Sequence, residues 1–142
     1  MSKQKHFQSK LSRISGSNYA DVLSRARTIY AVYRRKTKRN PYVRSPYFKK
    51  DKIFLSRFWS HIMEKRINPR TKRLKYYACC LDLLGNSTCE PTIKPDPGDA
   101  NRRFYRFYGR SADGYEFIVQ VVEEIKTGNK FLISCFPPGH RE

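Results

Sequence analysis

Three stretches near the C-terminal end of the chain alternate between polar and apolar residues, and short turns connect them. They are "RRFYRFYG" (102–109), "YEFIVQVVEEI" (115–125) and "KFLISCFP" (130–137). β-Branched and aromatic residues with a period of two are typical of strands. The connections contain Gly114 and Gly128, which suit hairpin turns. The sequence therefore predicts an antiparallel meander of three strands, or of four if part of 88–94 adds an edge.

The residues before this meander have helical spacing of apolar positions. Asn18 can cap a helix that continues to about residue 36, and further helices are expected over 51–66 and 70–85. The proline-containing stretch 37–48 is expected to be a loop. The predicted fold class is α+β, with N-terminal helices packed on one face of a C-terminal antiparallel β-meander of three to four strands. Residues 1–17 are expected to be a flexible basic arm, and residues 18–142 a single domain.

The charge of the chain is large and unevenly distributed. Its formal net charge is +18, from 30 basic and 12 acidic residues. Residues 1–75 hold 22 Lys and Arg against three acids, whereas residues 76–142 hold eight against nine. Such a basic half indicates a polyanionic partner, with nucleic acid ahead of an anionic membrane surface.

Several other classes of protein are disfavoured. No apolar run has the roughly 20 residues of a membrane span, and the N-terminus lacks a signal-peptide pattern. The four cysteines include an adjacent pair, Cys79 and Cys80, but no pair with zinc-ligand spacing. We therefore expect a cytoplasmic protein with reduced thiols, no metal and no cofactor.

The stretch 102–137, "RRFYRFYGRSADGYEFIVQVVEEIKTGNKFLISCFP", carries a resemblance. With the helices before it, it resembles the phage and mobile-element branch of the barnase–EndoU–colicin–RelE-like nuclease superfamily. The resemblance covers about a quarter of the chain. It implies a metal-independent endoribonuclease, often a toxin, with its site on the open face of the sheet. RNA (tRNA or mRNA) and an acidic antitoxin or immunity protein are the partners that it implies.

Metal-free RNA cleavage requires a base for the 2′-OH, a cation for the phosphate and an acid for the leaving oxygen. Arg106 and Lys130 are candidates for the cation, with Lys130 and Ser134 on one face of their strand. No histidine lies in the three strands, so His61 on the second predicted helix is the candidate acid. The candidate catalytic residues are thus His61, Arg106, Lys130 and Ser134.

Each of these residues has a simpler interpretation. Arg106 and Lys130 also fit the solvent face of a half-exposed sheet, and His61 also fits a polar helix face. Glu123 and Glu124 could supply a base, but charged residues are ordinary at strand ends.

The candidate substrate-binding residues lie in both halves of the chain. "RARTIYAVYRRKTKR" (25–39) is dense in cations and suits the phosphate backbone. Gln120 and Tyr108 could orient a phosphate and stack a base. The full set is Arg27, Arg34, Arg35, Lys36, Arg57, Arg103, Tyr108 and Gln120. The alternative to a nuclease is a non-catalytic nucleic-acid-binding accessory protein of a phage or mobile element, and a component of a ribosome-like assembly is a third hypothesis.

Overall fold

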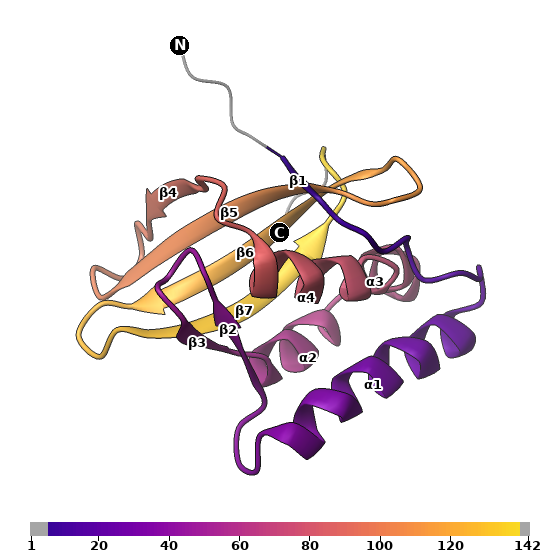
Figure 1. The fold of residues 1–142 in the computed structure, drawn as a ribbon, viewed down its shortest axis with the longest axis horizontal. Coiled ribbons are helices and arrows are strands. Elements are labelled where there is room, and N and C mark those ends of the chain that lie inside the picture. Colours follow the sequence, from indigo (N-terminus) through magenta and orange to yellow (C-terminus); the bar gives the residue numbers. More distant parts are fainter. Residues whose placement is uncertain (1–5, 140–142) are drawn as a thin grey trace.

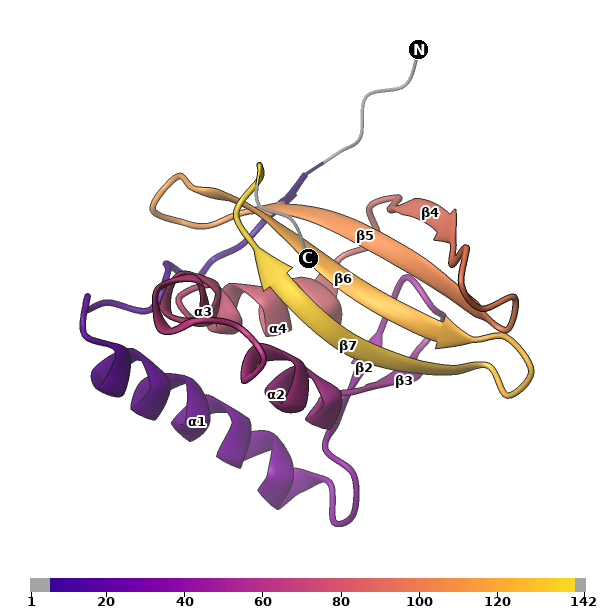
Figure 2. The same cartoon turned by 180° about the vertical axis from the view of Figure 1, so that it is seen from behind.

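The computed structural model describes residues 6–139, which form a curled mixed sheet with helices on one side (Figure 1). The seven strands have the order β1-β5-β6-β7-β3-β2, and β4 also pairs with β5, along the edge that β1 occupies at its far end. Helices α2, α3 and α4 pack against the sheet, and α1 lies outside them against α3 (Figures 1 and 2). The strands and helices are β1 (Phe7–Gln8), α1 (Tyr19–Lys36), β2 (Tyr42–Ser45), β3 (Asp51–Phe54), α2 (Ser56–Ile62), α3 (Ile67–Leu74), α4 (Tyr77–Asn86), β4 (Thr92–Pro95), β5 (Arg102–Arg110), β6 (Glu116–Glu124) and β7 (Asn129–Phe136).

The three strands expected near the C-terminus are present as β5, β6 and β7, paired antiparallel in that order. Gly114 and Gly128 lie in the two turns with φ of 91° and 75°. These left-handed conformations favour glycine because it has no Cβ. The fourth strand also exists, because β4 pairs antiparallel with β5.

The predicted fold class is nevertheless wrong. The sheet is mixed, since β3 runs parallel to β7 and β1 runs parallel to β5. Two of its strands, β2 and β3, come between α1 and α2. The helices are therefore not an N-terminal block that precedes a purely antiparallel meander.

The helix expected over 51–66 is a strand followed by a shorter helix. Residues 51–54 form β3, in which Lys52 is exposed and Ile53 is fully buried. β3 pairs with β2 and with β7, so its backbone groups are satisfied by neighbouring strands. The apolar run that follows forms α2, which buries Phe58 and Ile62.

The stretch expected as a loop before it contains β2 and a tight turn. Lys49 and Lys50 both have positive φ, 56° and 70°. The Lys50 N–H donates to Ser45 O at 2.7 Å, and the Arg44 side chain donates to Lys50 O at 3.0 Å. These bonds stabilise a backbone conformation that lysine adopts only at a cost.

The helix expected over 70–85 is two helices. α3 ends at Leu74 and α4 begins at Tyr77, with Lys75 and Tyr76 between them. Pro69 lies in the first turn of α3, where its missing N–H removes no helical hydrogen bond. The break turns α4 so that it buries Tyr77, Leu81 and Leu84 in the core.

Residues 6–17, expected to belong to a basic arm, run along the edge of the fold. β1 pairs with β5, Ser9 donates to Asp82 Oδ2 at 2.7 Å, and Ile14 lies in the core. Arg13 Nε is 3.0 Å from Asp113 Oδ2. Residues 1–5 of the expected arm lie outside the described part of the chain.

Candidate nucleic-acid interface

The sheet has an inner face, packed on the helices, and an outer face opposite. Tyr105, Val119 and Leu132 belong to the inner face and to the hydrophobic core. Between the paired residues Gln120–Ser134 and Val121–Leu132 the register shifts by one, which leaves Ile133 without a partner residue. This irregularity has the form of a β-bulge, and it changes which side chains of β7 share a face.

The bulge separates two residues that were predicted to act together. Simple alternation puts Lys130 and Ser134 on one side of β7. In the structure Lys130 points to the inner face with Leu132, whereas Ser134 aligns with Gln120 on the outer face. The prediction that Lys130 and Ser134 share a face is therefore wrong, and the two residues lie in different environments.

On the outer face, Arg106, Gln120 and Ser134 form one row across β5, β6 and β7. We call them the outer row. Arg106 Nε donates to Gln120 Oε1 at 3.0 Å. Arg73 of α3 reaches the same row, since its Nη1 donates to Ser134 Oγ at 2.8 Å. The row thus combines two guanidinium groups, an amide and a hydroxyl, which are groups that bind phosphate. Arg73, Gln120 and Ser134 are buried, however, so Arg106 is the member of the row that is partly exposed.

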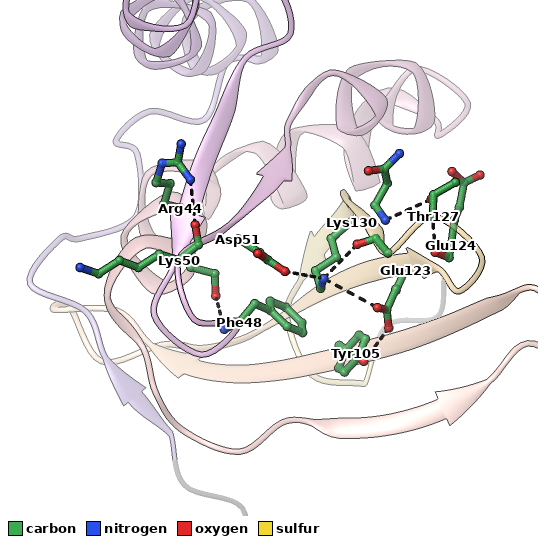
Figure 3. Close-up of polar contacts among 12 residues, drawn as sticks. Arg44, Phe48, Lys50, Asp51, Tyr105, Glu123, Glu124, Thr127 and Lys130 are labelled. Atoms are coloured by element: carbon green, nitrogen blue, oxygen red, sulfur yellow. Dashed lines mark hydrogen bonds and ion pairs between the residues drawn. The ribbon is translucent and has the colours of Figure 1, made fainter.

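On the inner face, Lys130 lies in a compact ionic cluster (Figure 3). Its Nζ is 3.1 Å from Asp51 Oδ2 and 3.7 Å from Glu123 Oε2, and it donates to Gly128 O at 3.0 Å. The Phe48 ring lies 4.9 Å from the same ammonium. The Lys130 side chain is only 7% exposed. Two carboxylates therefore already neutralise this lysine, and it connects the β2–β3 turn to the meander.

Tyr105 completes what we call the Lys130 cluster (Asp51, Tyr105, Glu123 and Lys130). Its hydroxyl donates to Glu123 Oε1 at 2.7 Å. Burial, and then the hydrogen bond to the Glu123 carboxylate, raise the pKa of Tyr105 to about 12. Arg103, predicted to bind substrate, is also beside Glu123, at 3.4 Å from Nε to Oε1. Arg103 and Lys130 thus serve this internal cluster and are not part of the outer row.

His61, the predicted acid, lies on α2. Its Nδ1 is 4.0 Å from Glu64 Oε1 and its side chain is 26% exposed. Arg57, one turn earlier, lies over the Phe131 ring at 3.5 Å and 3.9 Å from Glu124 Oε2. Tyr108 is on the outer face, and its hydroxyl is 3.0 Å from Thr92 Oγ1.

The most cationic surface begins at the C-terminal end of α1. Three adjoining hollows, of about 360, 500 and 380 Å³, follow one another from α1 along the β2–β3 hairpin to the β6–β7 turn. The first two share Lys38 and Arg39, and the last two share Lys52 and Phe54. We call this surface the basic groove. Its cationic residues are Arg34, Arg35, Lys36, Lys38, Arg39, Arg44, Lys52 and, at the far end, Lys130.

The cations of this groove differ in how they are neutralised. Within residues 6–139, Lys130 is the one groove cation with a carboxylate within 4.0 Å. The others are exposed side chains without such a partner in the described chain. Unneutralised cations that line one groove attract a polyanion, because their fields add. Of the substrate-binding residues predicted on α1, Arg34, Arg35 and Lys36 line the groove, whereas Arg27 lines a separate hollow with Tyr19 and Leu23.

Sequence reasoning missed Arg44, Lys52 and Arg73. The first two enter the groove because residues 42–54 form a hairpin, which was not expected. Arg73 was expected in the middle of one continuous helix over 70–85. The helix instead breaks at residues 75–76, next to Arg73. A helix-breaking signal there would have been the only clue, and "RLKYYA" contains none.

Compared with protein-family models, with curated proteins and with solved structures, the chain shows no significant match. The resemblance to the barnase–EndoU–colicin–RelE-like nucleases therefore stays a prediction. Among the described residues, none of the helices is both long enough and apolar enough for a membrane span. Over the same residues, no group of three His, Cys, Asp or Glu side chains could hold a metal ion.

Proposed function

We propose that this protein binds nucleic acid, with the phosphate backbone in the basic groove. The observation that carries the proposal is the chain of groove cations without carboxylate partners, from Arg34 to Lys52, within residues 6–139. Elsewhere on the surface several cations are paired, as in Arg13–Asp113 and Arg110–Glu116, and the unpaired ones of the described chain do not gather in one groove. Cations without a carboxylate partner contribute little to the stability of the fold, whereas they can bind an external polyanion.

The groove geometry favours nucleic acid over a flat anionic membrane. The cations lie on the end of a helix, on the following loop and on a hairpin, so they line a concave path and not one flat side. A membrane-surface helix also requires an apolar face beside its cations. α1 buries its apolar residues Val22 and Ala26 against the fold, and its cationic last turn is at the groove.

The test is a comparison of two triple variants. The groove variant is Arg35→Ala/Lys38→Ala/Arg39→Ala, and the control is Lys10→Ala/Lys72→Ala/Lys126→Ala, which removes three exposed cations outside the groove. Fluorescence anisotropy with a labelled oligonucleotide, over a series of salt concentrations, measures both affinity and salt dependence. We expect the groove variant to bind about tenfold more weakly, with a salt slope smaller by about 2.

The control variant should keep the affinity of the wild type. Equal weakening by both variants would mean that binding follows net charge and not the groove. A wild-type protein that binds no oligonucleotide at low salt would contradict the proposal altogether.

A second candidate function is metal-independent RNA cleavage at the outer row. It is favoured by Arg106, whose partly exposed guanidinium is held in place by Gln120 and could contact a phosphate. The row itself has no group that could act as base or acid at neutral pH, so His61 or Glu124 would have to supply one. Incubation of RNA with the protein and EDTA tests this candidate. Cleavage that Arg106→Ala abolishes would support it, and an acidic inhibitor protein would then be the partner to look for.

A further inference from the structure

The outer face carries a second pattern, which runs parallel to the outer row. Tyr42 pairs with Phe54, and Phe54 pairs with Phe131 in the adjacent strand. Phe131 in turn aligns with Val122, and Val122 with Phe104. We call these residues the aromatic row: four aromatic side chains and one valine in register across β2, β3, β7, β6 and β5.

Three of the four aromatic rings are in contact, and all four are partly exposed. The ring centroids of Tyr42 and Phe54 are 6.3 Å apart, and those of Phe54 and Phe131 are 5.8 Å apart. Tyr42, Phe54, Phe131 and Phe104 are each half-buried, whereas the inner-face residues Tyr105 and Phe107 are buried. Partly exposed rings on an open sheet face could be a hydrophobic surface for any partner, so their surroundings decide among partners.

Cations surround the aromatic row. Lys52 and Arg44 lie over the Tyr42 ring at 4.6 and 5.4 Å. Arg57 lies over Phe131 at 3.5 Å, and Arg102 over Phe104 at 5.6 Å. A protein partner with an apolar surface would not require cations beside three of the four rings. A nucleic-acid strand presents both bases to stack on rings and phosphates to pair with cations.

The row is also continuous with the basic groove. Tyr42, Phe54 and Lys52 line the middle hollow together with Lys38 and Arg39. A backbone held by the cations at the end of α1 would thus lead directly to the rings of β2 and β3. Bases can reach those rings only when they are unpaired, because a duplex hides their faces.

We infer that the aromatic row is a base-stacking platform, and that the ligand is single-stranded nucleic acid. The inference rests on the proposed function, since the groove supplies the phosphate contacts. Tyr42, Phe54 and Phe131 would stack successive bases, while Lys52, Arg44 and Arg57 neutralise the phosphates between them. Residues with this arrangement bind without strong sequence preference, because every base has a face to stack.

The test compares Tyr42→Leu and Phe131→Leu with Tyr115→Leu. Tyr115 is the matched control: it is exposed, a cation lies over its ring (Arg13, at 3.6 Å), and it is in the β5–β6 turn away from the row. Each variant is titrated with oligo(U) RNA, oligo(dT) DNA and an RNA duplex of equal length, and its thermal unfolding is recorded. Leucine keeps an apolar side chain, and Tyr42 is near the sheet edge, so at least that variant is expected to fold.

We expect the wild type to prefer the single strands to the duplex by about tenfold or more. Tyr42→Leu and Phe131→Leu should each weaken single-strand binding about tenfold and leave duplex binding unchanged. Tyr115→Leu should change neither. Loss of binding to RNA but not to DNA, or the reverse, would identify which strand stacks there.

The inference is overturned if the wild type binds the duplex as tightly as the single strands. It is also overturned if the row variants bind the single strands as well as Tyr115→Leu does, or if they lose single-strand and duplex binding equally. In these cases the groove could still bind phosphates, and the groove triple variant would still lose affinity. Absence of binding to all three probes would instead contradict the proposed function.

Discussion

Lys130 and Arg106 lie on neighbouring parts of one sheet, and their surroundings differ in almost every respect. Lys130 is buried, points to the β2–β3 turn and is neutralised by Asp51 and Glu123. Arg106 is on the outer face, is half-buried, and donates a hydrogen bond from Nε to the neutral side chain of Gln120. The difference indicates that one cation holds the fold together and that the other is available to a ligand.

One unpaired residue decides which of the two cations shares a face with Ser134. Lys130 and Leu132 pair with the inner-face residues Glu123 and Val121, and because Ile133 is bulged, Ser134 and Phe136 face outward. Two polar residues four positions apart on a strand are therefore not evidence for one site.

Insertion of one alanine between Lys130 and Phe131 should have the largest effect. Unless a second bulge absorbs it, the insertion shifts the pairing of β7 with β6 by one residue and turns Leu132 out of the core. We expect the variant to lose its cooperative thermal unfolding and its near-UV circular dichroism. Insertion of one alanine after Gly98, in the exposed loop before β5, is the control and should leave both intact. A cooperative transition at the wild-type temperature would show that β7 tolerates either register.

Lys130→Met should destabilise the protein by about 3 kcal/mol, because it leaves the largely buried Glu123 carboxylate without its lysine. Urea unfolding measures the change. Arg106→Met is the matched substitution on the outer face and should cost less than about 1 kcal/mol. The assignment would fail if Arg106→Met proved the more destabilising of the two.

Arg106→Ala should lower the affinity for a single-stranded oligonucleotide about fivefold, since it removes one charge-assisted contact to phosphate. Lys130→Met, assayed at a temperature at which it is folded, should bind the oligonucleotide with the affinity of the wild type. Arg110→Ala is the control, because Arg110 is exposed and already paired with Glu116. Binding that depends on Lys130 but not on Arg106 would reverse the roles given to the two faces.

Tyr105 gives a smaller effect that depends on pH. Its pKa in the folded protein is raised to about 12, so the phenol stays protonated after an unfolded chain has begun to release that proton near pH 10. Its contribution to stability is therefore complete below about pH 10 and is lost as the pH rises toward 12. Relative to Tyr105→Phe, the wild type should lose stability over this interval. Phenolate absorbance should locate the Tyr105 titration near pH 12, and a titration near pH 10 would contradict the hydrogen bond to Glu123.

Much of the C-terminal half was predictable from the sequence. Alternation and the two turn glycines suffice for β5, β6 and β7, because hairpins with short turns leave few other pairings. The alignment of Arg106 with Gln120 follows from the same alternation, whereas Ser134 joins them only because of the bulge at Ile133. The burial of three of the four cysteines, Cys79, Cys80 and Cys135, also agrees with an expectation of small apolar thiols.

The region before it was not predictable in the same way. The run "DKIFLSRFWSHIM" fits a helix as well as a short strand followed by a helix. Pairing with β7 decides between the two. It joins Ile53 to Lys130, which lies 77 positions later in the chain. The β2–β3 turn has lysines, not glycines, at its left-handed positions. Without this hairpin, neither the groove residues Arg44 and Lys52 nor the aromatic row could be found.

The bulge at Ile133 was also not predictable from the sequence. No glycine marks it, and the residue types on either side suit a regular strand. It is selected by packing, which keeps Leu132 in the core and lets Cys135 donate to Arg73 O at 3.4 Å. Local sequence patterns do not contain that information.

Ultraviolet crosslinking of a bound single strand, followed by mass spectrometry of the peptides, tests the central claim most directly. Both faces of the sheet carry aromatic side chains, so the crosslinking yields of the two faces can be compared directly. We predict crosslinks to Tyr42, Phe54 and Phe131 on the outer face. Crosslinks concentrated on Tyr47, Phe48 and Tyr105, which pack together on the inner face beside Lys130, would contradict the claim.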